Sequence, residues 1–228
     1  MKQNLIVPEL SVPEKILWAA SAAGVTVLFC LVPQKNPLTL IATLVGVTSL
    51  LFVAKGHVSG QFLQLVFCVL YAIGFKYYGE AITYMGMTFP SDLFAAIVWL
   101  KNPSKKGKSE VRMAHLTPKK SAVAIFISSM ATVIFYFILK KLNTANLEIS
   151  TVSVATSMAA SVLIIMRVPY YALAYAANDI VLIAMWILAS AENPVYIPMI
   201  FNFVIFLVND LYGFFSWKKL RRIQEERN

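Results

Sequence analysis

The sequence predicts an all-α integral membrane protein with eight transmembrane helices. Of its 228 residues, 59% are hydrophobic and 14% are charged, and the mean hydropathy is +0.70. These values lie outside the range of soluble globular domains. A helix that spans the bilayer core needs about 20 mostly apolar residues, so a chain of this length can supply eight of them with short connections. We therefore expect a single membrane domain over residues 1–228.

Eight apolar runs, each bounded by turn residues or charges, define the expected helices. They cover residues 14–32, 37–54, 58–77, 79–101, 121–139, 149–166, 169–190 and 194–217. Pro33 and Pro37 flank the first turn, and Asn193-Pro194 marks the last. Because seven more apolar runs follow the first, we expect 14–32 to be a retained helix rather than a cleaved signal.

The lysine and arginine residues predict the orientation of these helices. With eight spans, both termini and every even-numbered loop lie on one side of the membrane. That side holds 16 of the 20 Lys and Arg residues. The other side holds four, which are Lys35, Lys76, Lys140 and Lys141. Positively charged loops are retained in the cytoplasm, so both termini are expected to be cytoplasmic.

The longest connection, residues 102–120, is polar and basic, as is the tail at 218–228. This composition predicts a flexible cytoplasmic linker that also anchors the topology, with some affinity for the anionic surface of the lipid bilayer. The net charge of +9 is concentrated in such loops and at the C-terminus. We therefore expect no nucleic-acid partner.

An internal repeat links the fourth and eighth runs. Asp92–Lys101 reads DLFAAIVWLK and Asp210–Lys219 reads DLYGFFSWKK, 118 residues further on, with four identical positions. If the repeats are 37–101 and 149–217, then 121–139 is a single connecting helix and 14–32 is an extra N-terminal helix. One connecting helix gives both repeats the same orientation. Transporters built from parallel repeats bind their substrate near the midplane, between the halves.

Several polar residues lie at membrane depth in the last two runs. An ionisable residue there costs on the order of 3 kcal/mol on insertion scales, which suggests a function. Asp179 lies near the middle of its run, beside Asn178. Helical spacing places Tyr171 and Tyr175 on the face of Asn178. In the eighth run, Asn202, Asn209 and Tyr212 share one face, and Asp210 adjoins Asn209.

Two such faces can enclose a cavity for a flat aromatic ring with hydroxyl or amide groups. The predicted substrate-binding residues are Tyr171, Tyr175, Asn178, Asp179, Asn202, Asn209, Asp210 and Tyr212. Asn178 and Asn209 would bind sugar or amide groups, the tyrosines would contact rings, and Asp179 would favour a cationic ring. Alternatively, buried Asn and Asp residues join helices to one another, and Tyr and Trp anchor helix ends at the membrane interface.

Catalytic and metal-binding motifs are absent from the sequence. There is no phosphate-binding loop, zinc motif or serine elbow, and both histidines, His57 and His115, fall in expected loops. Cys30 and Cys68 lie in apolar runs without partners at metal-ligand spacing, so free thiols are expected. We therefore expect no catalytic residue, no metal and no cofactor, and a protein that is not an enzyme.

The chain resembles the PnuC family of nicotinamide riboside transporters, which has relatives that carry thiamine or riboflavin. The matching motifs are YGEA at Tyr78–Ala81, the Trp99–Lys101 helix end, the Arg167–Asn178 stretch and NDLYGFFSW at Asn209–Trp217. The resemblance implies a 3+1+3 helix arrangement similar to that of SWEET sugar transporters. It also implies a bacterial cell-membrane protein, a homo-oligomer such as a trimer, and facilitated diffusion without ion coupling. A cytoplasmic kinase would phosphorylate the vitamin precursor and trap it.

One departure from the family pattern bears on the substrate. Well-studied nicotinamide riboside carriers have a WxxW pair just before the mid-helix Asn, where this chain has YYALAYAAN. At least one stacking tryptophan is missing or replaced, so thiamine and riboflavin remain alternatives. Two other classes of protein remain open as well. A membrane-embedded enzyme would use the Asp179 and Asp210 carboxyl groups, and a receptor would bind the solute without moving it.

Overall fold

The computed structural model describes residues 7–31, 36–74, 82–105, 109–144 and 146–227. Within these ranges the chain forms eight α-helices and no β-strand, as the sequence predicts. The helices are α1 (Val12–Leu31), α2 (Pro37–Ala54), α3 (Val58–Gly74), α5 (Phe89–Lys101), α6 (Pro118–Lys141), α7 (Leu147–Ile165), α8 (Tyr171–Glu192) and α9 (Ile197–Glu226). The YGEA motif at Tyr78–Ala81, Pro33, and Lys2, Lys35, Lys76, Lys106 and Lys108 lie outside the described residues.

Six of these helices are long and apolar enough to cross a membrane, and Val58–Ile73 of α3 is a shorter apolar helix. The remaining helix, α5, has 13 residues and follows a π-helical turn at Tyr84–Thr88. Pro90 lies in the first turn of α5 and has no N–H to donate to the preceding turn. The wide π turn before Pro90 lets the chain continue as one helical run. A short 3-10 turn, Pro194–Tyr196, likewise leads into α9.

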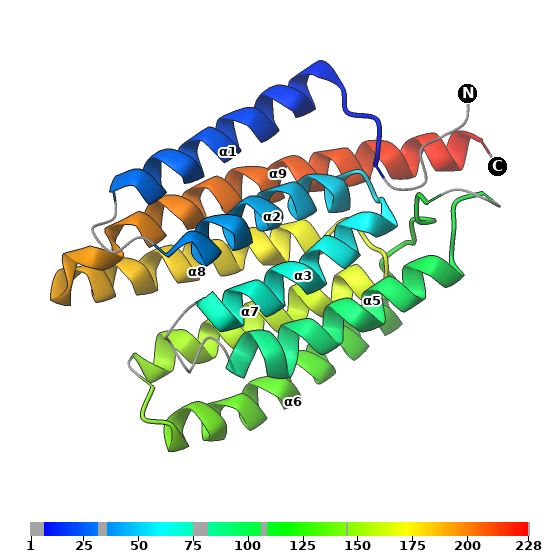
Figure 1. The fold of residues 1–228 in the computed structure, drawn as a ribbon. Coiled ribbons are helices and arrows are strands. Elements are labelled where there is room, and N and C mark those ends of the chain that lie inside the picture. The colour runs from blue at the N-terminus through cyan, green and yellow to red at the C-terminus, as the bar shows by residue number, and fades with distance from the viewer. Residues whose placement is uncertain (1–6, 32–35, 75–81, 106–108, 145, 228) are drawn as a thin grey trace.

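The helices lie side by side in an elongated bundle (Figure 1). The start of α1, the end of α9 and the α5–α6 connection share one end, which we name the terminal end. The α6–α7 connection lies at the opposite, distal end. The blue α1 and the green α6 lie at opposite edges of the bundle in this view. Both edge helices have large apolar side chains exposed, such as Ile16 of α1 and Phe137 of α6, as expected of helices that face lipid.

Two turns of the same shape end α2 and α7 at the terminal end. After α2, the Gly56 N–H donates to Val53 O and the His57 N–H to Phe52 O. After α7, the Arg167 N–H donates to Ile164 O and the Val168 N–H to Leu163 O. Both are Schellman turns, in which the residue after the C-cap takes the left-handed conformation. Its φ is +62° at Gly56 and +60° at Arg167.

The α5–α6 connection lies across these two turns. The Val111 N–H donates to Gly56 O over 2.8 Å, and the Ala114 N–H donates to Arg167 O over 2.9 Å. Val111 is fully buried, and the Met113 N–H donates to Gln224 Oε1 of α9. We name residues 109–114 the strap. The strap pairs with both halves of the bundle, of which the first contains α2, α3 and α5 and the second contains α7, α8 and α9. The structure differs here from the expected flexible linker because Val111 and Met113 alternate with polar residues and reach the core.

Two tryptophans join the halves of the bundle near the terminal end. Trp99 of α5 donates from Nε1 to Ile164 O of α7 over 3.1 Å, and Trp217 of α9 donates to Val53 O of α2 over 2.7 Å. Their ring centroids lie 5.4 Å apart. Both side chains are fully buried. Buried Trp N–H groups need an acceptor, and each finds one at the end of a helix in the other half.

Candidate substrate-binding cavity

A cavity of about 590 Å³ lies between the two halves of the bundle. Its inner end is lined by Val53, Ile164 and Tyr171, next to the buried tryptophan pair. From there it extends along α3, α7, α8 and α9 to Asn143 and Asn146 of the α6–α7 connection at the distal end. Cavities of a few hundred Å³ are the usual size for small-molecule sites.

Three carboxyl groups line this cavity, from Asp92 of α5, Asp179 of α8 and Asp210 of α9. Each is at most 5% exposed. Asp179 Oδ2 finds no donor among the described protein groups. Asp210 of α9 supplies the neighbouring carboxyl group. No Lys or Arg occurs among the described residues that line the cavity, so a positive charge would have to come from the solute.

Asn178 is held from the side by two hydroxyl groups of α7. Its Oδ1 accepts from Ser153 Oγ and from Thr156 Oγ1, each over 2.9 Å. No described residue bonds to the Asn178 amide nitrogen, although Asn178 lines the cavity. The hydroxyl pair therefore fixes the side chain and leaves its NH₂ group as a donor for a solute.

Aromatic side chains supply much of the remaining surface. Tyr171 and Tyr175 lie one turn apart on α8, with ring centroids 6.2 Å apart at 80°. The Tyr175 hydroxyl is 3.3 Å from Ser161 Oγ. Trp186 lies further along α8, and both Trp186 and Phe67 of α3 line the cavity. Rings of this kind stack on flat heteroaromatic solutes.

The structure brings five of the eight predicted residues together. Tyr171, Tyr175, Asn178, Asp179 and Asp210 line the cavity. Asn209 and Tyr212 face α1 instead. Asn209 Nδ2 donates to Ser21 Oγ over 2.9 Å, and the Tyr212 hydroxyl donates to Glu14 Oε1 over 2.6 Å. Asn202 is half-buried and does not line the cavity. These three residues share one face of α9, as predicted, but α1 packs against that face.

Several cavity residues are missing from the sequence prediction. Gln64 of α3 lines the cavity, and its Oε1 accepts from Ser49 Oγ over 2.6 Å. Ser153 and Thr156 hold Asn178. A signal for α7 exists in the sequence, because Ser150, Ser153, Ser157 and Ser161 recur at helical spacing. Gln64 is an isolated polar residue in an apolar run and offers no such periodicity.

Among the described residues, no group of three or more His, Cys, Asp or Glu side chains is arranged to hold a metal ion. Of the two cysteines, Cys30 is exposed and Cys68 is buried with its Sγ 3.6 Å from Asp92 Oδ2. Both thiols are free. The three carboxyl groups lie beside amides, hydroxyls and rings, an arrangement suited to binding a solute.

An apolar helical bundle around a central cavity, lined mostly by apolar side chains with a few polar ones, is the architecture of a membrane carrier for small solutes. The family model described as "Nicotinamide mononucleotide transporter" matches residues 36–219. The chain therefore belongs to this family of membrane transporters.

Individual relatives agree with this assignment. The chain is 25% identical over 211 residues to the nicotinamide riboside transporter PnuC of Neisseria mucosa, covering 90% of this chain and 80% of that protein. It is 26% identical over 212 residues to the nicotinamide riboside transporter PnuC of Haemophilus influenzae, covering 91% of each. A crystal structure of the vitamin B3 transporter PnuC has the same fold, with a TM-score of 0.81, 24% identity and 96% of both chains covered.

The comparisons confirm the resemblance to the PnuC family and the multi-pass helical architecture. The relatives and the structural neighbour are transporters, which agrees with the prediction that the chain is not an enzyme. The match of the family model begins at residue 36 and leaves α1 outside it.

Proposed function

We propose that this protein transports nicotinamide riboside, or a closely similar vitamin precursor, across the cell membrane by facilitated diffusion. The observation that supports this proposal most strongly is the set of acidic side chains in the cavity. Asp92, Asp179 and Asp210 line it without any Lys or Arg among the described lining residues. Nicotinamide riboside contains a pyridinium ring with one positive charge, and a buried carboxylate favours an adjacent cation.

The same charges argue against a phosphorylated solute. The family description names the mononucleotide, whereas the curated relatives are named for the riboside. A phosphate group has up to two negative charges and normally binds to Arg, Lys or a helix N-terminus. A cavity with three carboxyl groups would repel it. We therefore assign the unphosphorylated riboside to this chain.

The rings and amides fit the remaining parts of such a solute. Tyr171 and Tyr175 would contact the pyridinium ring in place of the family's tryptophan pair. The Asn178 amide nitrogen would donate to a carboxamide or ribose oxygen. Thiamine, which also has a cationic ring, is the alternative substrate that fits these features best after the riboside. Riboflavin has a neutral ring and gains nothing from the carboxyl groups.

For the mechanism, we propose that two three-helix bundles, α2–α5 and α7–α9, rock about the cavity as parallel repeats in a SWEET-like 3+1+3 arrangement. The reciprocal bonds of Trp99 and Trp217, each to the other bundle, support this symmetry. So do the matching turns at Gly56 and Arg167. The cavity reaches the distal end, while the tryptophans and the strap close the terminal end. Exchange between two such states is alternating access.

The charge distribution supports a terminal end that faces the cytoplasm of a bacterium, with the distal end outside. A cytoplasmic kinase would then trap the solute, because a phosphorylated product is repelled by the carboxyl groups that bind its precursor. We also propose a homo-oligomer, such as a trimer, whose protomers each contain a complete cavity.

Uptake into proteoliposomes tests this function. The parent should equilibrate radiolabelled nicotinamide riboside across the membrane with saturable kinetics and without a sodium or proton gradient, and excess unlabelled mononucleotide should compete poorly. Asn178→Ala should lose most of this uptake, whereas Asn202→Ala, the same change on a residue outside the cavity, should retain it. Strong competition by thiamine would change the assigned substrate. Binding without flux would indicate a receptor, and no binding of any of these solutes would reject the proposal.

A further inference from the structure

The first helix lies outside the matched family region, and none of its described residues lines the cavity. It packs along the seam between α2 and α9 (Figure 1). Toward α2, Trp18 Nε1 donates to Thr48 Oγ1 over 3.0 Å. Toward α9, Ser21 Oγ accepts from Asn209 Nδ2 over 2.9 Å. Gly24 fits closely against α9, because an added Cβ would lie 3.0 Å from Ile205 Cδ1.

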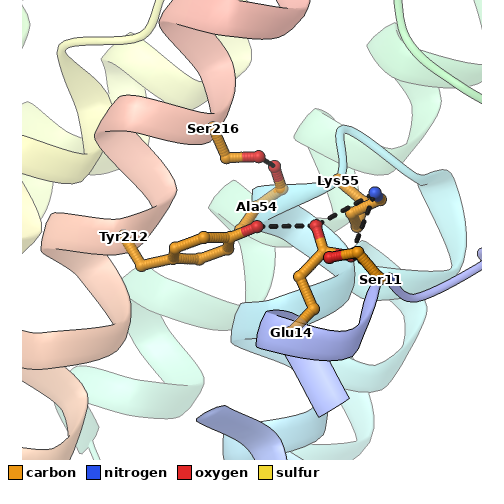
Figure 2. A network of polar contacts seen from close by, with 6 residues as sticks. All are labelled: Ser11, Glu14, Ala54, Lys55, Tyr212 and Ser216. Carbon is orange, nitrogen blue, oxygen red and sulfur yellow. Dashed lines mark hydrogen bonds and ion pairs between the residues drawn. The ribbon is translucent and has the colours of Figure 1, made fainter. Parts of the chain in front are cut away.

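At the terminal end, one carboxylate of α1 reaches both neighbours (Figure 2). Glu14 Oε1 lies 3.0 Å from Nζ of Lys55, which is the C-cap residue of α2. The same oxygen accepts from the Tyr212 hydroxyl of α9 over 2.6 Å. The other oxygen accepts from the Ser11 N–H, also over 2.6 Å. The Glu14 side chain is only 5% exposed, so water competes little for these bonds.

This carboxylate therefore joins elements that belong to different bundles. Under the proposed mechanism, α2 is part of the first bundle and α9 is part of the second. Their direct contact beside Glu14 includes one bond, from Ser216 Oγ to Ala54 O over 2.6 Å (Figure 2). Opening the terminal end would separate these two helices. Movement of α9 away from α2 must break either the Tyr212–Glu14 bond or the Glu14–Lys55 ion pair.

We infer that α1 is a brace across the α2–α9 seam, and that the Lys55–Glu14–Tyr212 link holds the terminal end of the transporter closed. The link stabilises the state in which the cavity reaches the distal end. It also explains why Asn209 and Tyr212 are polar although they do not line the cavity. This inference rests on the two-bundle mechanism proposed above.

Distances between spin labels at the terminal end test the brace in the full chain. Lys101 of α5 and Lys219 of α9 are exposed and lie at corresponding ends of the two bundles. Both would be changed to Cys and labelled in a Cys30→Ser background, in which the buried Cys68 stays in place beside Asp92. The parent should show mainly the short distance of the closed end. Tyr212→Phe removes one hydroxyl and should raise the population of longer distances about tenfold.

Two further variants separate the brace from general loosening of α1. Glu14→Gln retains an acceptor for Tyr212 but removes the ion pair with Lys55, so it should shift the distances in the same direction and by less. Thr48→Val removes an α1 bond that does not join α2 to α9, and it should leave the distances as in the parent. Unchanged distances in both Tyr212→Phe and Glu14→Gln, or an equal shift in Thr48→Val, would overturn the inference. Uptake by the unlabelled parent tests the proposed function separately.

Discussion

Helices α8 and α9 both contain Asn, Asp and Tyr residues at membrane depth, but the two helices use them differently. On α8, Tyr171, Tyr175, Asn178 and Asp179 all line the cavity. On α9, only Asp210 does so, while Asn209 and Tyr212 bond to α1. A polar residue in a membrane helix must find a partner. On α8, these residues bond in part to α7 hydroxyl groups and still face the cavity, where we propose that the solute binds. On α9, another helix supplies the partners of Asn209 and Tyr212.

The largest expected effect comes from the charge on α8. Asp179→Asn removes a buried carboxylate from the cavity, so the KM for the cationic riboside should rise by about tenfold or more. The uncharged, reduced form of the riboside has nearly the same shape and should be affected by less than about threefold. Competition assays with both forms provide the comparison. Equal losses for the two forms would show that Asp179 acts through shape rather than charge.

On α9, the expected loss is in stability. Asn209→Ala leaves Ser21, which is buried, without its partner and should lower the free energy of unfolding by about 1 kcal/mol. Thermal unfolding in detergent, followed by Trp fluorescence, measures this loss. The KM of the folded fraction should stay near that of the parent. A large rise in KM with an unchanged melting temperature would place Asn209 in the substrate site after all.

An effect on KM smaller than that of Asp179→Asn is expected from the α7 hydroxyl groups that hold Asn178. The double variant Ser153→Ala, Thr156→Val removes both donors to Asn178 Oδ1 and should raise the KM about three- to tenfold. Ser153→Thr, Thr156→Ser retains both hydroxyl groups and serves as the matched control. If the control loses as much affinity as the double variant, packing rather than hydrogen bonding positions Asn178.

The smallest effect concerns the terminal end, away from both polar faces. Burial of His57 lowers its pKa below the usual value of about 6.5, although the nearby charge of Glu110 partly opposes this shift. The neutral ring accepts from the Ser59 N–H. Stability due to neutral His57 is therefore present above pH ~6.5 and is lost as the pH falls through the lowered folded-state pKa. In a plot of melting temperature against pH, His57→Asn should flatten the acid limb without changing riboside affinity at neutral pH. An unchanged acid limb would contradict this assignment.

The helices were predictable because long apolar runs leave few alternatives in a membrane protein. The helix expected at 79–101 was harder to predict, because a π turn at Tyr84–Thr88 precedes Pro90 and leaves α5 short. The α8 face was also predictable, since Tyr171, Tyr175 and Asn178 follow helical spacing and Asp179 adjoins them.

The partner of the α9 face could not be read from the sequence. Spacing shows that Asn209 and Tyr212 share a face, but it does not show whether that face meets a cavity or another helix. The answer depends on α1, about 190 residues earlier in the chain, whose Glu14 and Ser21 supply the bonds. The strap was missed for a related reason. Val111 and Met113 are two apolar residues in a basic segment, too few to predict burial.

Equilibrium binding tests the difference between α8 and α9 most directly. Titration calorimetry would measure the Kd of nicotinamide riboside for the purified parent, Asn178→Ala and Asn209→Ala. We predict that Asn178→Ala weakens binding by about tenfold, whereas Asn209→Ala stays within about twofold of the parent. The opposite order, with affinity lost only in Asn209→Ala, would show that the solute binds at the α1 face and not in the central cavity.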